Sequence, residues 1–167
     1  LADADEVVTT FYPIQKIRTR LHHEFNTSEG KHYVDFEGVD FADGQKTTLS
    51  AMMDNGKVTL IDFWASWGGP CRQEISQNLV RLYKEYKDKG LNIIGVDVWD
   101  KIPDHKKAVE SLGIEYPQLI DTTSNATDLY GVIGIPTILL IDKDGTIVRR
   151  GIRGEEIEKA VVELLNR

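Results

Sequence analysis

The sequence predicts an α/β domain built on a mixed, partly parallel central sheet with helices on both faces. Residues 58–65 and 91–98 form two almost wholly apolar runs, which have the length and composition of strands covered on both faces. Helical patterns follow both runs, and a strand–turn–strand pattern precedes the last helix. This alternation is typical of a parallel sheet with flanking helices, and the closing hairpin makes the sheet mixed.

Length and charge limit the possible functions. The 167 residues suit one domain, or one domain with an appendage, and the start at Leu1 rather than Met indicates a processed or truncated chain. The 20 basic and 27 acidic residues give a net charge of −7, which excludes nucleic-acid binding as the main role. No apolar run approaches the ~20 residues of a membrane-spanning helix.

Cysteine and histidine usage argues against metal sites. The single cysteine excludes a disulfide framework and a cysteine-rich zinc site. His22 and His23 are adjacent, and neighbouring residues do not share a helix face, so a surface position is favoured over metal binding. The sequence therefore implies no metal and no other cofactor.

The first thirty residues differ from the rest. Their apolar residues recur at spacings of three and four, which predicts a helix with one apolar face: Ile14, Ile17, Leu21 and Phe25. Pro13 suits the first turn, and the polar residues 26–30 end the helix. Residues 1–30 are either a helical linker or extension from an upstream domain, or a helix packed on the domain of residues 31–167.

A β-hairpin and a long helix are predicted next. Alternation in residues 33–36, the Asp43-Gly44 turn and the segment 47–49 predict the hairpin. After the strand 58–65, Pro70 begins a helix that Gly90 ends. The apolar stripe of this helix is Cys71, Ile75, Leu79, Leu82 and Tyr86.

The second half of the chain repeats these patterns. Strand 91–98 is followed by a helix that Gly113 closes, and Ser124 caps a shorter helix. Two strands joined by an Asp-Lys-Asp-Gly turn, and a final amphipathic helix, complete the domain. In order, these segments are 104–112, 125–130, 137–141, 146–150 and 155–166.

The segment of chemical interest is residues 63–71, where a strand runs into a glycine-rich turn and a helix start. Cys71 lies in the first turn of that helix, where the positive end of the helix dipole makes a thiol more acidic and more reactive. The alternative is that Cys71 is a small buried apolar residue of the helix stripe. Asp62 lies in the apolar strand, and burial raises the pKa of a carboxyl group. Asp62 is either a proton-transfer group beside the thiol, or a carboxylate that faces water or a backbone partner.

Two segments together resemble a known fold family. Phe63-Trp64-Ala65-Ser66-Trp67-Gly68-Gly69-Pro70-Cys71 is similar to the active-site segment of thioredoxin-fold proteins, whose motif is Trp-Cys-Gly-Pro-Cys, and Gly134-Ile135-Pro136-Thr137 is similar to their cis-proline loop. The resemblance extends over residues 31–167. It implies a thioredoxin-like fold with an N-terminal β-hairpin and a leading helix.

Further features resemble the TlpA/ResA-like extracytoplasmic thiol-disulfide oxidoreductases. They are Asp43-Gly44 with Leu49-Ser50, Arg72 and Glu74 after the cysteine, and the segment 140–145. This resemblance implies reduction or isomerisation of disulfides in exported proteins, in the periplasm or otherwise outside the cytoplasm. The implied partners are disulfide- or thiol-containing proteins or peptides and an upstream thiol reductant.

The resemblance also implies roles for individual residues. Cys71 is the resolving cysteine and Asp62 is its proton acceptor. Glu74 tunes the cysteines, although an acid favoured by the helix dipole is the alternative. Pro136 is cis, faces Cys71 and exposes the Ile135 backbone to an extended substrate peptide. The remaining substrate-binding residues lie in the turn: Trp67, Gly69 and Pro70.

The sequence departs from the family at Gly68, which stands where the nucleophilic cysteine is expected. Without that cysteine, the chain cannot form an internal disulfide or complete the two-cysteine cycle, so we predict no dithiol oxidoreductase activity. Three explanations stay open. Gly68 is a substitution introduced into an oxidoreductase, or a natural loss that leaves a redox-dead binding module, or Cys71 acts alone as a one-cysteine peroxidase, by analogy with the Thr-x-x-Cys motif of peroxiredoxins.

Overall fold

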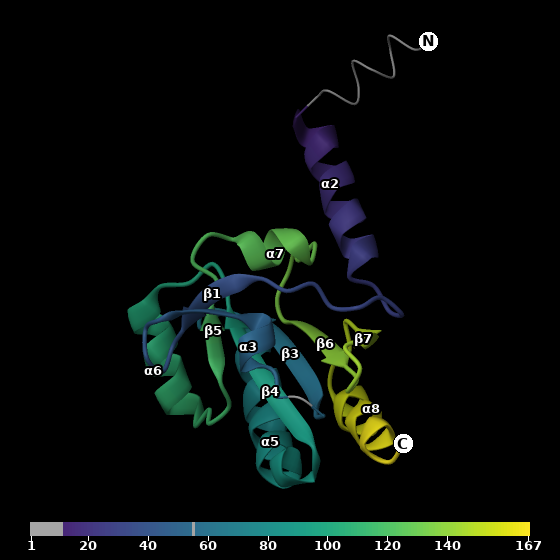
Figure 1. The fold of residues 1–167 in the computed structure, drawn as a ribbon. Coiled ribbons are helices and arrows are strands. Elements are labelled where there is room, and N and C mark those ends of the chain that lie inside the picture. Colours follow the sequence, from purple (N-terminus) through teal and green to yellow (C-terminus); the bar gives the residue numbers. More distant parts are fainter. Residues whose placement is uncertain (1–11, 55) are drawn as a thin grey trace.

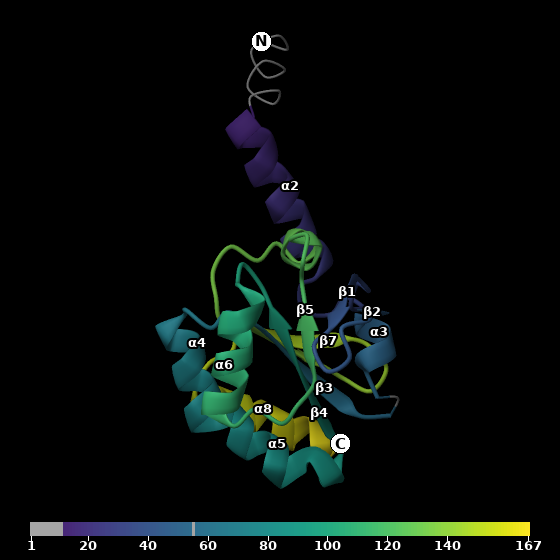
Figure 2. The same cartoon turned by 90° about the vertical axis from the view of Figure 1, so that its left-hand side faces the viewer.

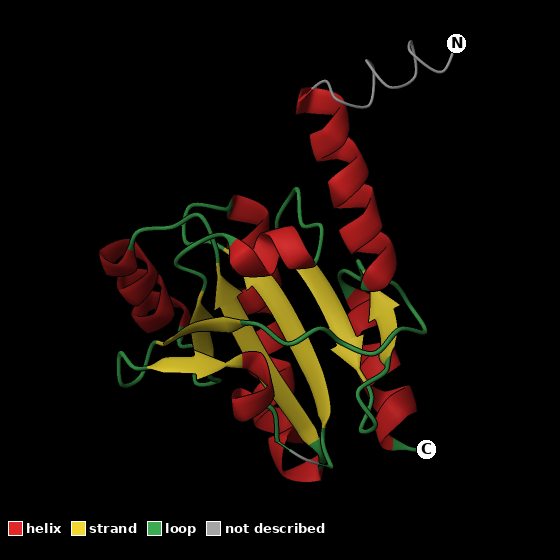
Figure 3. Cartoon of the chain, turned by 45° about the horizontal axis from the view of Figure 1, so that its top comes forward, coloured by secondary structure: helices red, strands yellow, loops and turns green. Residues whose placement is uncertain are grey.

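A mixed sheet forms the centre of the molecule (Figures 1 and 3), and it has seven strands. This computed structural model describes residues 12–54 and 56–167. The strand order is β2-β1-β5-β4-β3-β6-β7, and the strands are β1 (Glu37–Asp40), β2 (Lys46–Thr48), β3 (Val58–Trp64), β4 (Leu91–Asp97), β5 (Gln118–Ile120), β6 (Thr137–Ile141) and β7 (Ile147–Arg150). Strands β3, β4 and β5 are parallel, and the other pairs are antiparallel. The predicted mixed sheet is confirmed.

Helices cover both faces of this sheet, as predicted (Figure 2). The helices that cover the faces are α3 (Leu49–Met52), α4 (Gly69–Glu74), α5 (Val80–Tyr86), α6 (Ile102–Leu112), α7 (Asn125–Leu129) and α8 (Glu155–Leu165), and α2 (Tyr12–Asn26) precedes them in the chain. Apolar residues of α4, α5, α6 and α8 pack in one core, and α3 and α7 pack in the core on the opposite face. Burial of these two cores is the main favourable term in folding.

Strand β3 lies inside the sheet between β4 and β6, and all seven of its residues are buried. Leu60 and Trp64 belong to the core beneath α4 and α5, whereas Ile61 and Phe63 belong to the opposite core. Because side chains alternate along a strand, Asp62 points to the same face as Leu60 and Trp64. The strand therefore presents a carboxyl group toward the helix that carries Cys71.

The helix predicted from Pro70 onward is interrupted. A π-helical segment, η1 (Ile75–Leu79), separates α4 from α5, and a 3-10 turn, η2 (Lys87–Lys89), leads to Gly90. The wider π turn inserts extra backbone without leaving the helix axis, and such segments are often found near functional sites. The stripe from Cys71 to Leu82 stays buried across the interruption.

The strand predicted at residues 33–36 is wrong, because β1 begins only at Glu37. The backbone of Val34 forms hydrogen bonds with a side chain rather than with a neighbouring strand. Its N–H donates to the Tyr130 hydroxyl at 2.9 Å, and its carbonyl accepts from the same hydroxyl at 2.5 Å. The second strand ends at Thr48, whose side chain caps α3 through the Ala51 N–H at 3.1 Å.

Strand β5 was not predicted. The strand has only three residues, too few for a period to be visible, but its position between β1 and β4 buries all of them. Ser124 is the N-cap residue of α7, as predicted, but it has a left-handed conformation and its side chain does not cap the helix. Asp121 accepts the Thr127 N–H at 3.3 Å instead.

Helix α2 stands on one side of the domain (Figures 1 and 2). Three residues of its predicted apolar stripe are exposed. Ile17, Leu21 and Phe25 are 49%, 51% and 62% exposed. The helix meets the domain near its C-terminal end, where His23 Nδ1 lies 2.6 Å from the Asp128 carbonyl oxygen. These residues belong to neither core, although α2 contacts α7 of the domain. Residues 1–11 of the predicted extension lie outside the described residues.

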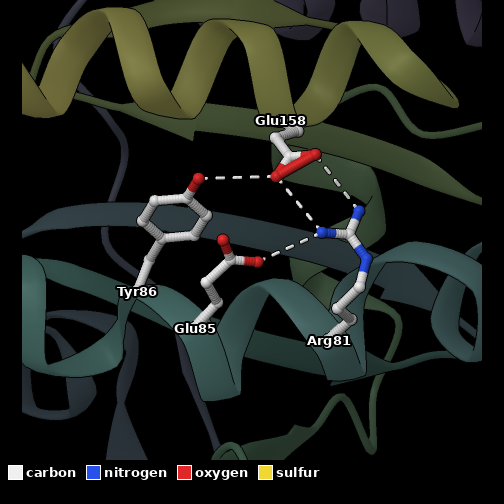
Figure 4. Close-up of polar contacts among 4 residues, drawn as sticks. All are labelled: Arg81, Glu85, Tyr86 and Glu158. Atoms are coloured by element: carbon white, nitrogen blue, oxygen red, sulfur yellow. Dashed lines mark hydrogen bonds and ion pairs between the residues drawn. The ribbon is translucent and has the colours of Figure 1, made fainter.

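A polar cluster joins α5 to α8 on the surface (Figure 4). Both terminal nitrogens of Arg81 donate to Glu158 at 3.2 Å, and one also donates to Glu85 at 3.3 Å. The Tyr86 hydroxyl donates to Glu158 at 3.4 Å. Hydrogen bonding from Arg81 lowers the pKa of Glu158, so this carboxylate stays charged.

No helix within residues 12–54 and 56–167 has the length and apolarity needed to cross a membrane.

Candidate functional site

The turn after β3 and the first turn of α4 form the candidate site. Gly68 precedes α4 with φ −83° and ψ 109°, a conformation open to any residue. The Gly68 N–H donates to the Ala65 carbonyl at 3.1 Å, and the Gly68 carbonyl accepts the Arg72 N–H at 3.0 Å. Pro70 suits the helix start because the missing N–H needs no partner there. These bonds fix Cys71 in the first turn of α4.

The environment of Cys71 corrects the expectation of an acidic thiol. The side chain has no exposed surface. Burial raises the pKa of the Cys71 thiol to about 11, the Asp62 carboxyl adds to this rise, and a backbone hydrogen bond at Ala65 opposes it. Desolvation therefore outweighs the helix dipole. A one-cysteine peroxidase needs an accessible thiolate, so this geometry argues against that interpretation.

Position 68 lies where a second sulfur would meet Cys71. A Cβ atom added at Gly68 is 2.9 Å from the Cys71 Sγ and 3.4 Å from the Cys71 Cβ. In disulfides the two Cβ atoms are about 3.5–4.5 Å apart. A cysteine at position 68 would therefore reach bonding distance after an adjustment of about a tenth of an ångström, and the backbone imposes no need for glycine.

Asp62 is the other titratable group buried beside Cys71. It has no exposed surface, and neither carboxyl oxygen has a hydrogen-bond partner among the described residues. Burial raises the pKa of Asp62 to about 8; the charge of Glu74 adds to the rise and Arg153 opposes it. Asp62 is thus mostly protonated at neutral pH. The Tyr116 hydroxyl, which sequence analysis did not identify, is also buried without a partner among those residues, and burial together with the Asp62 charge raises its pKa.

Glu74 connects α4 to the start of α8. Its Oε1 accepts the Gly154 N–H at 2.9 Å and the Arg153 Nε–H at 3.2 Å, and its Oε2 accepts from Asn78 at 2.9 Å. Glu74 is the sixth residue of α4, so the alternative of a first-turn acid of that helix is wrong. Its carboxylate instead lies at the N-terminus of α8, where the dipole favours negative charge.

The predicted substrate-binding residues differ in exposure. Trp67, Gly69 and Pro70 are exposed, and the Trp67 side chain is 62% accessible. The Ile135–Pro136 peptide bond is cis; Ile135 is half-buried and Pro136 is buried at the start of β6. The substrate-binding role of these five residues stays a prediction.

Sequence analysis missed residues of the β4–α6 loop that contact the turn. The Trp67 indole N–H donates to the Trp99 carbonyl at 2.9 Å, and Asp100 accepts two bonds from Ser66 at 2.7 and 2.8 Å. These contacts join segments about thirty residues apart in the sequence. They could be predicted only from the parallel pairing of β3 with β4, which places the ends of both strands side by side.

Within residues 12–54 and 56–167, no group of three or more His, Cys, Asp or Glu side chains is arranged to hold a metal ion. The His22 ring bonds to Asn26 at 3.2 Å, and His23 bonds to Asp128.

Comparison with known sequences assigns the family. Residues 30–150 match the AhpC/TSA family. The chain belongs to this family. It is also similar to the thiol-disulfide oxidoreductase ResA of Bacillus thuringiensis subsp. konkukian, with 32% identity over 88% of this chain and 85% of the relative. The ResA of Bacillus subtilis is 31% identical over 83% of this chain and 75% of the relative. By sequence, the chain is of the ResA type of thiol-disulfide oxidoreductase.

Solved structures agree with this assignment. The thioredoxin domain of a thiol-disulfide oxidoreductase from Bacteroides vulgatus matches with a TM-score of 0.74 and 30% identity, over 83% of this chain and 99% of that domain. A thiol:disulfide interchange protein from Bacteroides sp. matches with a TM-score of 0.74 and 30% identity, over 85% of this chain and 93% of the other. The predicted thioredoxin-like fold of this AhpC/TSA family member is confirmed.

Proposed function

We propose that the chain is a ResA-type oxidoreductase scaffold whose chemistry requires a sulfur at position 68, and that with Gly68 it performs no dithiol exchange. One observation carries the proposal. The place for a Cβ atom at position 68 is 2.9 Å from the Sγ of the only cysteine in the chain. Cys71 cannot replace the missing nucleophile, because it has no exposed surface and its raised pKa keeps it protonated.

The complete cycle needs both sulfurs. A thiolate at position 68 attacks one sulfur of a substrate disulfide, so that a mixed disulfide forms and the other substrate sulfur leaves as a thiolate. Cys71 then loses its proton and attacks the sulfur at position 68, which releases the second substrate sulfur and leaves a 68–71 disulfide. The ionised fraction of Asp62 takes that proton, which its pKa of about 8 permits near neutral pH. Two electrons from an upstream thiol reductant restore both thiols.

The substrates we infer are proteins or peptides with disulfides or thiols. Such partners fit the relatives, which are named thiol-disulfide oxidoreductases. Trp67, Gly69 and Pro70 give the turn an exposed surface for them. In this proposal, the half-buried Ile135 offers its backbone to an extended segment, and Pro136 orients it toward Cys71.

Insulin-disulfide reduction tests this function. The native chain is compared with Gly68→Cys, with Gly68→Ser, which adds a side chain of similar size without redox chemistry, and with the double variant Gly68→Cys, Cys71→Ser. We expect activity only in Gly68→Cys, together with one internal disulfide detected by thiol titration. Turnover by the native chain, or an inactive Gly68→Cys that nevertheless forms the disulfide, would show the proposal to be wrong.

A redox-independent binding module is the second candidate. Three large apolar side chains are exposed in the candidate site and in the two loops that flank it: Trp67 at 62%, Trp99 at 42% and Ile133 at 68%. Such a patch is a common feature of protein-binding surfaces. In this case, binding of a reduced, unfolded polypeptide survives Cys71→Ser and is lost in Trp67→Ala. Loss of binding in Cys71→Ser would exclude this candidate.

We further propose that residues 1–30 are an extension of the domain of residues 31–167, and that the protein works outside the cytoplasm. The family match begins at residue 30, and α2 stands clear of both cores, which supports the boundary. Location rests on the resemblance to extracytoplasmic family members. Folding of residues 31–167 alone tests the first proposal, and protease accessibility in intact cells of the source organism tests the second.

A further inference from the structure

The segment that follows β4 forms hydrogen bonds with the turn that carries the candidate site. The Ser66 N–H and hydroxyl both donate to the Asp100 carboxylate, at 2.7 and 2.8 Å. The Ser66 carbonyl accepts from Arg72 at 3.1 Å, so all three polar groups of Ser66 are bonded. Ser66 lies two residues before Gly68 and five before Cys71. Its position therefore sets where the turn begins.

A second contact fixes the neighbouring residue. The Trp67 indole N–H donates to the Trp99 carbonyl at 2.9 Å. Trp99 has a φ of 49°, a left-handed conformation that is uncommon for a bulky residue and that directs this carbonyl toward Trp67. The β3–β4 pairing also continues past the strand end, because the Val98 N–H donates to the Trp64 carbonyl at 2.9 Å. The loop after β4 thus follows the turn closely along its length.

Asp97 lies behind Asp100 and completes the arrangement. It is the last residue of β4 and is 2% exposed. One of its carboxyl oxygens has no hydrogen-bond partner among the described residues, and its carboxyl group lies within reach of the Asp100 carboxyl group. Two carboxyl groups bond only when one keeps its proton. Burial, together with a hydrogen bond to Asp100, raises the pKa of Asp97 to about 9. Burial also acts to raise the pKa of Asp100, but hydrogen bonds from Asp97 and Ser66 outweigh it and lower that pKa. At neutral pH, Asp97 is therefore the donor and Asp100 the charged acceptor.

We propose that Asp97 and Asp100 are positioning residues, a carboxyl pair with one shared proton that holds Ser66 and thereby the turn bearing position 68 and Cys71. Neither residue touches the reacting sulfur. When Asp97 loses its proton, the donor to Asp100 disappears, and the buried Asp97 and the half-buried Asp100 carry two neighbouring negative charges. The hold on Ser66 then weakens, and the buried Cys71 thiol becomes accessible to solvent.

Other titratable and charged groups lie around the pair and the thiol. Burial raises the pKa of Asp62, beside Cys71, to about 8, and the Asp62 charge raises the pKa of the thiol, so ionisation of Asp62 makes the alkylation profile less steep. His105 from α6 is buried and its pKa is lowered, so it is neutral in alkaline solution. Arg72 from α4 donates to the Ser66 carbonyl. Asp121 donates its backbone N–H to the Asp97 carbonyl at 2.9 Å and accepts the Thr127 N–H through its carboxyl group, whose pKa burial raises. Lys101 contributes its backbone N–H to Asp100 at 2.9 Å.

The test is the pH profile of Cys71 alkylation by iodoacetamide between pH 7 and pH 10.5. It uses the single native cysteine, so it is independent of any sulfur at position 68 and of the proposed oxidoreductase function. Ionisation of one thiol increases the rate at most tenfold per pH unit. For the native chain, we expect the alkylation rate to increase more than tenfold per pH unit around pH 9. The reason is that opening of the turn exposes the thiol in addition to its ionisation.

The Asp97→Asn variant separates the contribution of turn opening from the contribution of thiol ionisation. The amide keeps a donor to Asp100 but cannot lose a proton in this range, so we expect the rate to rise no faster than tenfold per unit. Asp104→Asn, at an exposed position on α6, is the matched control and keeps the native steepness. Circular dichroism across the pH range verifies that each chain stays folded. A native profile no steeper than tenfold per unit, or an Asp97→Asn profile as steep as the native one, overturns the proposal.

Ser66→Ala provides a second variant that leaves the carboxyl pair intact. It removes the hydroxyl bond to Asp100, and the loss of one such bond corresponds to about fivefold faster alkylation at pH 7.5. An unchanged rate in the folded variant contradicts the positioning role.

Discussion

Glu158 and Asp62 are carboxyl groups of one domain that reach opposite charge states. Glu158 lies on the surface between α5 and α8, where Arg81 donates two hydrogen bonds to it and lowers its pKa (Figure 4). Asp62 lies in β3 without a hydrogen-bond partner among the described residues, and burial raises its pKa to about 8. Solvent exposure and hydrogen-bond partners, rather than residue type, therefore decide which carboxyl groups of this protein keep a proton at neutral pH.

The largest effect in this comparison is expected from Asp62→Asn. From pH 3.8 to about 8, unfolding releases the Asp62 proton, so the free energy of unfolding falls as pH rises, by up to about 1.4 kcal/mol per pH unit. Below and above that window, this residue adds no pH dependence. Asn does not titrate, so the stability of the variant relative to the native chain should increase by several kcal/mol between pH 5 and pH 8.

Urea unfolding at pH 5, 6, 7 and 8 measures this change. Asp88→Asn, at an exposed position, is the control and should reproduce the native pH dependence. If the curves for Asp62→Asn and the native chain run parallel, Asp62 is not protonated in the folded protein.

An intermediate effect is expected at Cys71, which shares the buried environment of Asp62. The rise of its pKa from 9.0 to about 11 reduces the thiolate at a given pH by about 100-fold. Alkylation at pH 7.5 should therefore be at least about 100-fold slower in the folded chain than in the same chain unfolded in urea. Similar rates in both states would mean that the thiol is neither buried nor suppressed.

The smallest effect is expected from Glu158→Gln on the surface. An exposed ion pair contributes about 0.5 kcal/mol, so the free energy of unfolding at pH 7 should fall by roughly that amount. The contribution of Glu158 is present above pH 4.5, because its pKa is lowered from that value, and it is lost as the pH falls through the lowered pKa. Thermal unfolding at low and at 1 M salt measures it, since salt should remove the difference. Glu156→Gln, an exposed neighbour on α8, is the control; an equal loss in both variants would show that the Arg81 bonds do not matter.

Sequence patterns identified the parts of the fold that have strong periodicity. The apolar runs that became β3 and β4 were placed within one residue, and β6 was placed at its observed bounds. β5 was missed because three residues carry no readable period, and the strand at residues 33–36 failed because Tyr130 replaces a neighbouring strand as partner. These errors occur where tertiary contacts decide the local structure.

In the candidate site, too, the sequence predicted the positions of residues within a motif but not the properties that depend on tertiary packing. The resemblance located Asp62, Gly68 and Cys71 on one strand–turn–helix unit, where the structure has them. The direction of the Cys71 pKa could not be obtained from its place at a helix start, because depth of burial depends on the packing of the whole domain. Asp97 and Asp100 lay outside every motif, since a pair of acids in a loop has no distinctive sequence signal.

Helix α2 is attached to the domain at its C-terminal end, so a small rotation about that end would move its N-terminal end by a larger distance. Arg150 donates to the Thr27 hydroxyl and carbonyl at 2.8 and 3.2 Å, and to the Tyr130 carbonyl at 2.5 Å, which fixes the residue just after the helix to the sheet. Fifteen residues at about 1.5 Å each make the arm roughly 22 Å long. A rotation of about 10° at the Thr27 fulcrum thus moves the Tyr12 end by roughly 4 Å, while the distance from the fulcrum to Cys71 does not change.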